Sequence, residues 1–246
     1  MIDTHAHISI NDPDIEKIIS NMNGYIIVSG TNKEDNIEVI KIVDKYPSAF
    51  GVIGIHPNEV DSMNEENLSF IERNINHPKI VGIGEIGLDY HYDIDKEFQK
   101  EYFIKQIKLA NKYKKTMVIH SRDAINDTYE ILKEYKEKDV KFDLHCFSSS
   151  TEMALKFISL NGMIGIGGVL TFKNSKILKE VVSSISLDKI LLETDSPYLS
   201  PFRGTKNEPK NVLLVAEEIA TIKNISVDEV LKRTTKNAIY QFDLDL

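Results

Sequence analysis

The N-terminal segment organises the rest of the sequence, and it reads Met1-Ile2-Asp3-Thr4-His5-Ala6-His7-Ile8. Residues two apart on a β-strand project from the same face, so a strand here presents His5 and His7 side by side. Two imidazoles in that arrangement can bind one metal ion. A lone histidine in a strand is more often a polar residue with no ligand role. The metal interpretation is favoured because further ligand-type residues end later apolar runs, namely Glu85, His120, His145 and Asp195.

Short β-rich runs recur along the chain. We expect strands at Ile2–Ile8, Gly24–Ser29, Phe50–Ile55, Lys79–Gly84, Thr116–His120, Lys141–His145, Gly162–Ile166 and Lys189–Glu193. Successive runs end roughly 20 to 36 residues apart, which leaves room for one helix and two loops in each interval. The pattern therefore predicts repeated βα units and a parallel sheet.

The intervals that can be tested show helical periodicity. The expected helices are Asp35–Lys45, Asp95–Lys115, Asp123–Lys138, Thr151–Leu160, Asn211–Lys223 and Ser226–Tyr240. Asn161 is typical of a left-handed helix end, and the pair Ser226 and Glu229 is typical of a capping box. These elements predict a single-domain (β/α)8 TIM barrel over residues 1–246. The alternative is an open doubly wound sheet, whose usual glycine-rich loop after the first strand is absent here.

Composition indicates an ordinary globular protein, with 41% hydrophobic and 28% charged residues. The single cysteine, Cys146, excludes an intrachain disulfide and suits a reducing compartment. We see no signal-like leader and no apolar run near the roughly 20 residues that span a bilayer, so we expect a cytoplasmic protein with no membrane contact. No obligate protein partner is evident. The net charge of −8 argues against nucleic-acid binding through a global basic surface, but it does not exclude a nuclease.

A barrel brings the ligand-type residues together, because active sites in this fold lie at the C-terminal ends of the strands. The six candidates follow strands 1, 4, 5, 6 and 8, and they are His5, His7, Glu85, His120, His145 and Asp195. Four imidazoles and two carboxylates exceed one tetrahedral zinc site, and they suit two divalent ions that share a bridging carboxylate. Two such ions can activate a water and stabilise the oxygens of a phosphoryl displacement.

Several short motifs in the chain also resemble those of a known family. They are THAHI, GIHP, GEIGLDY, HSR, HCF and ETDSPYL, followed by Arg203-Gly204 and Asn207-Glu208-Pro209. In this order they resemble the TatD family of metal-dependent deoxyribonucleases, within the amidohydrolase superfamily. The resemblance implies a barrel, a centre of two divalent metal ions (Mg, Mn or Zn), and hydrolysis of DNA phosphodiesters, often as a 3′–5′ exonuclease.

The same resemblance implies a ligand set. His5, His7, Glu85 and Asp195 correspond to the ligands of one ion, and Glu85 bridges to a second ion held by His120 and His145. Other amidohydrolases use a carboxylated lysine as the bridge, but none of residues 82–88 is lysine. This difference favours the nuclease branch over the branches that cleave amides and esters.

Four further residues are candidates for substrate contacts. His56 can contact a phosphate or a water, or it can hydrogen-bond carbonyls of the loop after Pro57. Arg122 can present a bidentate fork to a phosphate, or it can form a salt bridge to Asp123 or Asp89. Arg203 and Asn207 can contact a phosphate or a base, or they can simply close the loop to the next helix.

Cys146 follows His145 directly, and this invites a nucleophile interpretation. Neighbouring residues of a strand point to opposite faces, so we expect Cys146 to face the helix layer instead. The sequence thus favours a metal-dependent phosphodiesterase acting on DNA, with Asp195 as both ligand and base. One alternative is an amidohydrolase that cleaves an amide, ester or lactone with the same centre, and another is a non-catalytic metal-binding module.

Overall fold

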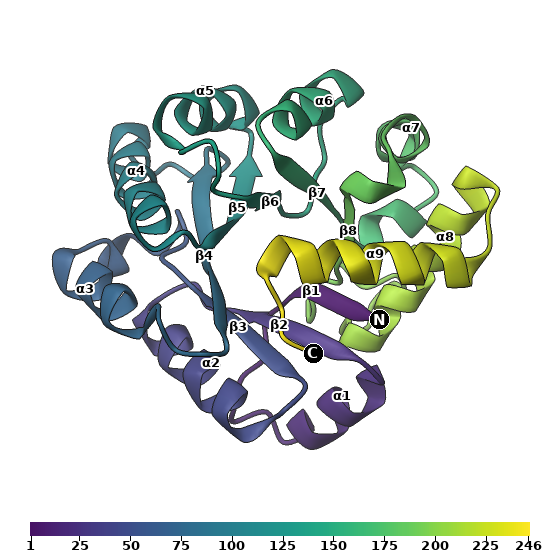
Figure 1. The fold of residues 1–246 in the computed structure, drawn as a ribbon, viewed down its shortest axis with the longest axis horizontal. Coiled ribbons are helices and arrows are strands. Elements are labelled where there is room, and N and C mark those ends of the chain that lie inside the picture. The colour runs from purple at the N-terminus through teal and green to yellow at the C-terminus, as the bar shows by residue number, and fades with distance from the viewer.

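The computed structural model describes residues 1–246 and contains a parallel sheet that curls into a barrel (Figure 1). The strands pair in chain order, and they are β1 (Ile2–Ala6), β2 (Tyr25–Ser29), β3 (Ala49–Ile53), β4 (Ile80–Asp89), β5 (Thr116–Arg122), β6 (Phe142–Leu144), β7 (Gly162–Ile166) and β8 (Ile190–Leu192). Every ladder is parallel. The predicted eight-stranded barrel is confirmed. The doubly wound alternative is wrong, because its strand order would have to reverse part-way through the sheet.

Helices cover the outside of the barrel (Figure 1). They are α1 (Ile15–Met22), α2 (Lys33–Lys45), α3 (Glu65–Asn74), α4 (Lys96–Tyr113), α5 (Ile125–Tyr135), α6 (Thr151–Ser159), α7 (Lys176–Ser184), α8 (Val212–Lys223) and α9 (Val227–Phe242). Short 3-10 turns occupy Val60–Ser62, Gly168–Thr171, Leu187–Lys189 and Pro209–Asn211. All six predicted helices are present with slightly shifted ends, whereas α1, α3 and α7 were not predicted. None of the helices is both long enough and apolar enough to cross a bilayer.

The predicted helix ends form through local hydrogen bonds. Asn161 adopts the left-handed conformation after α6, with φ of 69°. At α9, the hydroxyl of Ser226 accepts the N–H of Glu229 at 3.2 Å, which satisfies one of the free donors of the first turn. The other half of the expected capping box is absent, because the carboxylate of Glu229 pairs instead with Arg233 at 3.0 Å.

Two apolar clusters hold the barrel together. The larger one lies between the sheet and the surrounding helices, and the smaller one fills the barrel interior. Phe242 and Ala238 of α9 join the interior cluster, and α9 crosses one end of the barrel in Figure 1. The hydroxyl of Thr116, at the start of β5, donates to the carbonyl of Gln241 at 2.5 Å. Helix α9 therefore closes the N-terminal end of the barrel, and the C-terminal end is left for a site.

The barrel closes between the C-terminal end of β1 and the residues that follow β8. An isolated parallel bridge joins Ala6 to Ser196, and the N–H of His7 donates to the carbonyl of Ser196 at 2.7 Å. The N–H of Asp195 donates to the carbonyl of His5 at 3.0 Å. This seam places the Asp195 carboxylate beside the two N-terminal imidazoles.

Candidate metal centre

All six predicted ligands lie at the C-terminal end of the barrel. His5 belongs to β1, whereas His7, His145 and Asp195 lie just after β1, β6 and β8. Three expected strand ends were wrong in detail. Strand β4 runs on past Gly84 and therefore contains Glu85, whereas β1 and β6 end before His7 and His145. His120 lies within β5 as expected. The ladder between β4 and β5 is irregular between Ile83 and Ile86. Such irregularities re-aim a side chain, and this one lies at Glu85.

The first group of donors surrounds a single point. The Nε2 atoms of His5 and His7 lie 3.1 Å apart, and Glu85 Oε2 lies 3.4 and 3.5 Å from them. Asp195 Oδ1 lies 3.8 Å from Nε2 of His5 and 3.4 Å from Nε2 of His7. Ligands of a tetrahedral ion with bonds of about 2.0–2.1 Å stand about 3.3 Å apart. These nitrogen and oxygen donors therefore fit one divalent cation.

A second group lies on the other side of Glu85. The Oε1 atom of Glu85 lies 2.8 Å from Nδ1 of His120 and 3.7 Å from Nε2 of His56. The two oxygens of Glu85 thus face two different sets of nitrogens, as a bridging carboxylate requires.

His145 adjoins both groups. Its Nε2 lies 3.6 Å from Asp195 Oδ1 and 3.9 Å from Glu85 Oε1. Its ring stacks on that of His5, with centroids 3.5 Å apart and planes 18° apart. The resemblance implied that His145 serves only the second ion, together with His120, but the geometry allows His145 to serve either ion.

Each of the four predicted imidazole ligands has a partner on the ring nitrogen that faces away from the cluster. The pairs are His5 Nδ1 with Ser29 Oγ at 3.2 Å, His7 Nδ1 with the Ser29 carbonyl at 3.1 Å, His120 Nε2 with Asp89 Oδ2 at 3.2 Å, and His145 Nδ1 with Glu193 Oε2 at 3.0 Å. Such outer partners orient metal-binding imidazoles and select their tautomer. Ser29, Asp89 and Glu193 were not predicted as site residues. Their positions at the C-terminal ends of β2, β4 and β8 were the available signal.

His56 is oriented differently from the other four. Its Nδ1 accepts the N–H of Asn58 at 3.1 Å, so the neutral ring carries its hydrogen on Nε2, which faces Glu85. Burial, opposed in part by the charge of Glu85, lowers the pKa of His56 to about 4. Near neutral pH His56 is therefore a neutral hydrogen-bond donor toward the site. This geometry suits a contact to substrate or water better than metal ligation.

The ionisable groups of the cluster shift one another's pKa values. Burial raises the pKa of the Glu85 carboxyl, but the surrounding histidines, His56 first, outweigh it and hold that pKa well below its usual range. Burial opposes the charge on His120, but hydrogen bonds to Asp89 and Glu85 outweigh it and raise its pKa to about 9. Burial likewise opposes ionisation of Asp195, and the hydrogen bond to His7 outweighs it and lowers the pKa of Asp195. Both carboxylates are therefore ionised and available to a cation at neutral pH.

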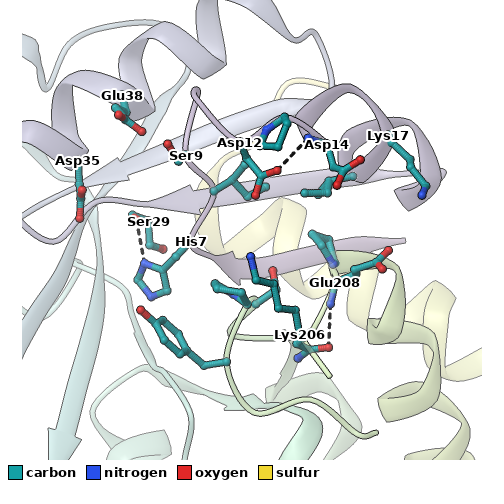
Figure 2. Close-up of a pocket in the computed structure, with 18 of the residues that line it drawn as sticks. His7, Ser9, Asp12, Asp14, Lys17, Ser29, Asp35, Glu38, Lys206 and Glu208 are labelled. Atoms are coloured by element: carbon teal, nitrogen blue, oxygen red, sulfur yellow. Dashed lines mark hydrogen bonds between the residues drawn. The ribbon is translucent and has the colours of Figure 1, made fainter. Parts of the chain in front are cut away.

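The donors open into a cavity of about 720 Å³, which is large enough for a nucleotide-sized ligand. Its wall includes Tyr92, Arg122 and Tyr198. A second cavity of about 470 Å³ adjoins it at His7, Asp35 and Tyr198. Figure 2 shows this second cavity and its charged lining, which comprises Asp12, Asp14, Lys17, Asp35, Glu38, Lys206 and Glu208.

Arg122 is free to bind a ligand. Its guanidinium lies 5.8 Å from the centre of the Tyr92 ring, at the wall of the larger cavity. The alternative salt bridges are absent, because Asp123 pairs with His91 at 3.5 Å and Asp89 pairs with His120 at 3.2 Å. The position is therefore compatible with the predicted phosphate contact.

The other two predicted substrate residues are placed less favourably. Arg203 lies in an exposed turn and lines neither cavity. Asn207 is buried and lines the second cavity. Its side-chain amide already forms hydrogen bonds within the protein, because the NH2 group donates to the Thr194 carbonyl at 2.7 Å and the oxygen accepts the N–H of Glu208 at 3.0 Å. Asn207 therefore holds the loop after β8 in place.

The expectation for Cys146 was wrong. We expected it to face the helix layer, yet it lines the larger cavity together with His145. The alternation of strand side chains stops because β6 ends at Leu144 and Cys146 adopts a left-handed conformation, with φ of 47°. Burial raises the pKa of the Cys146 thiol well above its usual value, so a thiolate nucleophile is disfavoured for a different reason.

Comparison with known proteins adds an independent line of observation. The profile of the family described as "TatD related DNase" matches residues 2–243. The chain belongs to the TatD-related family.

Relatives of this TatD-family chain share nearly its full length. It is 40% identical to the "Uncharacterized metal-dependent hydrolase YabD" of Bacillus subtilis, over 97% of each chain. It is 32% identical to the "Uncharacterized metal-dependent hydrolase YcfH" of Escherichia coli, over 100% of this chain and 96% of that one. The crystal structure of YJJV, a TatD homologue from Escherichia coli, superposes with a TM-score of 0.93 at 28% identity, covering 100% of this chain and 98% of the other. The resemblance drawn from the motifs is therefore confirmed.

Proposed function

We propose that this TatD-family chain is a metal-dependent hydrolase that cleaves DNA phosphodiester bonds with divalent ions held at the C-terminal end of the barrel. The observation that carries the proposal is the spacing of the donors around Glu85, where each oxygen faces a separate group of imidazoles. The names of the relatives as metal-dependent hydrolases support the metal requirement.

The positions of the donor atoms support one distribution of ligand roles. His5, His7, Glu85 and Asp195 would hold one ion, while the other oxygen of Glu85 and His120 would hold a second. His145 would complete either set. Divalent ions bound there would supply Lewis acidity and lower the pKa of a water in the site.

The remaining residues would position the substrate and move protons. Asp195 adopts a left-handed backbone conformation, with φ of 58°, which its backbone hydrogen bond to His5 helps to hold. Its ionised carboxylate would orient the attacking water and accept its proton. His56 would donate from Nε2 to a phosphate oxygen or to that water, and Arg122 would bind a phosphate from the wall of the cavity.

A second candidate function is hydrolysis of an amide, ester or lactone at the same centre. The second cavity favours it, because several carboxylates line that space and would repel a polyanion. The unpaired Arg122 favours a phosphate-bearing substrate instead. We rank DNA hydrolysis first, because the family description and the bridging glutamate agree with it.

A substrate panel tests the two candidates directly. The metal-free protein would be supplied with Mg²⁺, Mn²⁺ or Zn²⁺ and offered single-stranded, double-stranded and nicked DNA, RNA, simple esters and lactones. DNA labelled at either end separates exonuclease from endonuclease action. We expect metal-dependent release of nucleotides from DNA. Turnover of an ester or lactone with no turnover of any nucleic acid would replace the first candidate with the second.

A further inference from the structure

We infer that Glu193 is a positioning residue for the metal centre: it fixes which nitrogen of His145 is free to bind a cation. Glu193 is fully buried. Its Oε2 lies 3.0 Å from Nδ1 of His145, and its Oε1 accepts the N–H of Cys146 at 2.7 Å. This inference rests on the proposed metal centre, but it does not depend on DNA as the substrate.

The direction of the hydrogen bond follows from the chemistry of the groups. An ionised carboxylate can only accept hydrogen bonds, so the hydrogen between the two residues must belong to Nδ1 of His145. In the neutral ring this leaves a lone pair on Nε2, the nitrogen that lies 3.6 Å from Asp195 and 3.9 Å from Glu85. Glu193 therefore selects the tautomer that can bind a cation in the cluster.

Gly165 lies directly against one side of the carboxylate. A Cβ atom at Gly165 would lie 2.5 Å from Glu193 Oε2, so only glycine at this position leaves room for the carboxylate. The second oxygen accepts the backbone N–H of Cys146, and a backbone N–H can only donate. That hydrogen bond also holds the left-handed turn at Cys146, next to His145.

Because of these constraints, Glu193→Gln tests specifically which nitrogen of His145 carries the hydrogen. The carboxamide oxygen must stay on the Cys146 N–H, because two N–H donors cannot face each other. The amide NH2 group then faces Nδ1 of His145 and requires that nitrogen to accept. The hydrogen of the neutral ring moves to Nε2, where it blocks metal binding. The size of the side chain and the contact to Cys146 are both retained.

Asp3→Asn provides a matched control in the same barrel. Asp3 is equally buried, and its Oδ2 accepts the hydroxyl of Thr194 at 2.6 Å. Its Oδ1 accepts the N–H of Thr194 at 2.9 Å. A hydroxyl can reverse its hydrogen bond, so the carboxamide is satisfied without moving a proton on any imidazole. The control therefore carries the same acid-to-amide change without the tautomer effect.

The experiment measures Zn²⁺ binding to the metal-free protein by calorimetry, with thermal unfolding as a check on folding. We expect E193Q to bind Zn²⁺ about 10- to 100-fold more weakly than the parent at one site, as for other outer partners of metal ligands. D3N should bind as the parent does. In a double-mutant cycle, E193Q should add little once His145 is replaced by Ala, because Glu193 acts through His145. Parent-like affinity of a folded E193Q, or an equal loss in the His145→Ala background, would overturn the inference.

Ring ¹⁵N NMR of the Zn²⁺-loaded parent keeps the inference testable even where E193Q does not fold. We expect His145 to show a hydrogen on Nδ1 and coordination through Nε2. Coordination through Nδ1 would overturn the role of Glu193 directly. A parent that binds Zn²⁺ but cleaves no DNA would overturn the proposed substrate and leave this inference standing. A parent that binds no Zn²⁺ would overturn both the metal centre and the inference.

Discussion

The Nε2 atom of His5 lies 3.1 Å from the Nε2 atom of His7. The outer nitrogen of each ring contacts Ser29, so both inner nitrogens are directed at the same small space. Two lone pairs so close together repel unless a hydrogen or a cation lies between them. A cation satisfies both at once, and Glu85 and Asp195 supply the compensating charge.

The first prediction is that activity requires this cation. Treatment with a chelator should abolish hydrolysis, and Mg²⁺, Mn²⁺ or Zn²⁺ should restore it. His7→Ala should weaken metal binding, because it removes one donor of the first group, and it should keep the parent's far-ultraviolet circular dichroism. Full activity after exhaustive removal of metal would contradict the proposal.

The second prediction concerns the bridge. Glu85→Ala should lower the number of bound metal ions as well as the rate, since both oxygens of Glu85 face donors. Metal analysis of the dialysed protein measures this number. A variant that still holds two tightly bound ions would show that Glu85 does not link them.

The third prediction tests Asp195 as the base. Asp195→Asn keeps the size of the side chain and one coordinating oxygen but removes the charge and the proton acceptor. The rate at saturating metal should fall by roughly 10²- to 10⁴-fold. Metal content should fall less than it does in His5→Ala. Near-parent turnover with full metal occupancy would show that Asp195 is not the base.

The fourth prediction separates two arginines that the sequence treated alike. Arg122 lines the larger cavity, whereas Arg203 lines neither cavity, so Arg203→Ala serves as the charge-matched control. Arg122→Ala should weaken DNA binding and reduce the log–log salt slope by about one unit, as expected for one lost phosphate contact. Arg203→Ala should leave the slope unchanged. Equal slopes for the parent and both variants would remove Arg122 from the substrate contacts.

The fifth prediction concerns the pH dependence of stability in the metal-free protein. Burial lowers the pKa of His56 from 6.5 to about 4, so the unfolded chain binds more protons than the folded one between these values. The free energy of unfolding should therefore fall as the pH is lowered from 6.5 to 4, by at most about 3 kcal/mol. We call this pH-dependent range, from 6.5 to 4, the acid limb of the stability curve. In His56→Gln, the stability measured by thermal unfolding with chelator present should change less across the acid limb.

His120 supplies an internal control for the same measurement. Its pKa is raised to about 9, so the stability it contributes is complete below pH 6.5 and is lost as the pH rises toward 9. This alkaline limb should persist in His56→Gln. An acid limb of unchanged depth in that variant would show that His56 is not the group responsible.

The sequence alone determined the barrel and the identity of its six candidate ligands. Eight apolar runs separated by helix-length intervals predict parallel strands with helical crossovers, and the missing glycine-rich loop after the first run favours a barrel over a doubly wound sheet. Ligand-type residues at the ends of those runs must then meet at one end of the barrel. His5 and Asp195 could be joined in this way although they lie 190 residues apart in the chain (195 − 5).

Only the tertiary structure decided how these residues are held. The outer partners Ser29, Asp89 and Glu193 lie at or just after the ends of other strands than the imidazoles they orient, so their roles depend on how the strand ends are staggered around the barrel. Cys146 turned toward the cavity because β6 ended sooner than its apolar pattern suggested. Arg122 ends β5 at the wall of the larger cavity, whereas Arg203 lies in an exposed turn, and the sequence alone did not separate these two positions. Strand periodicity predicts the face of a side chain inside an element, but hydrogen bonds between distant segments decide its direction where the element ends.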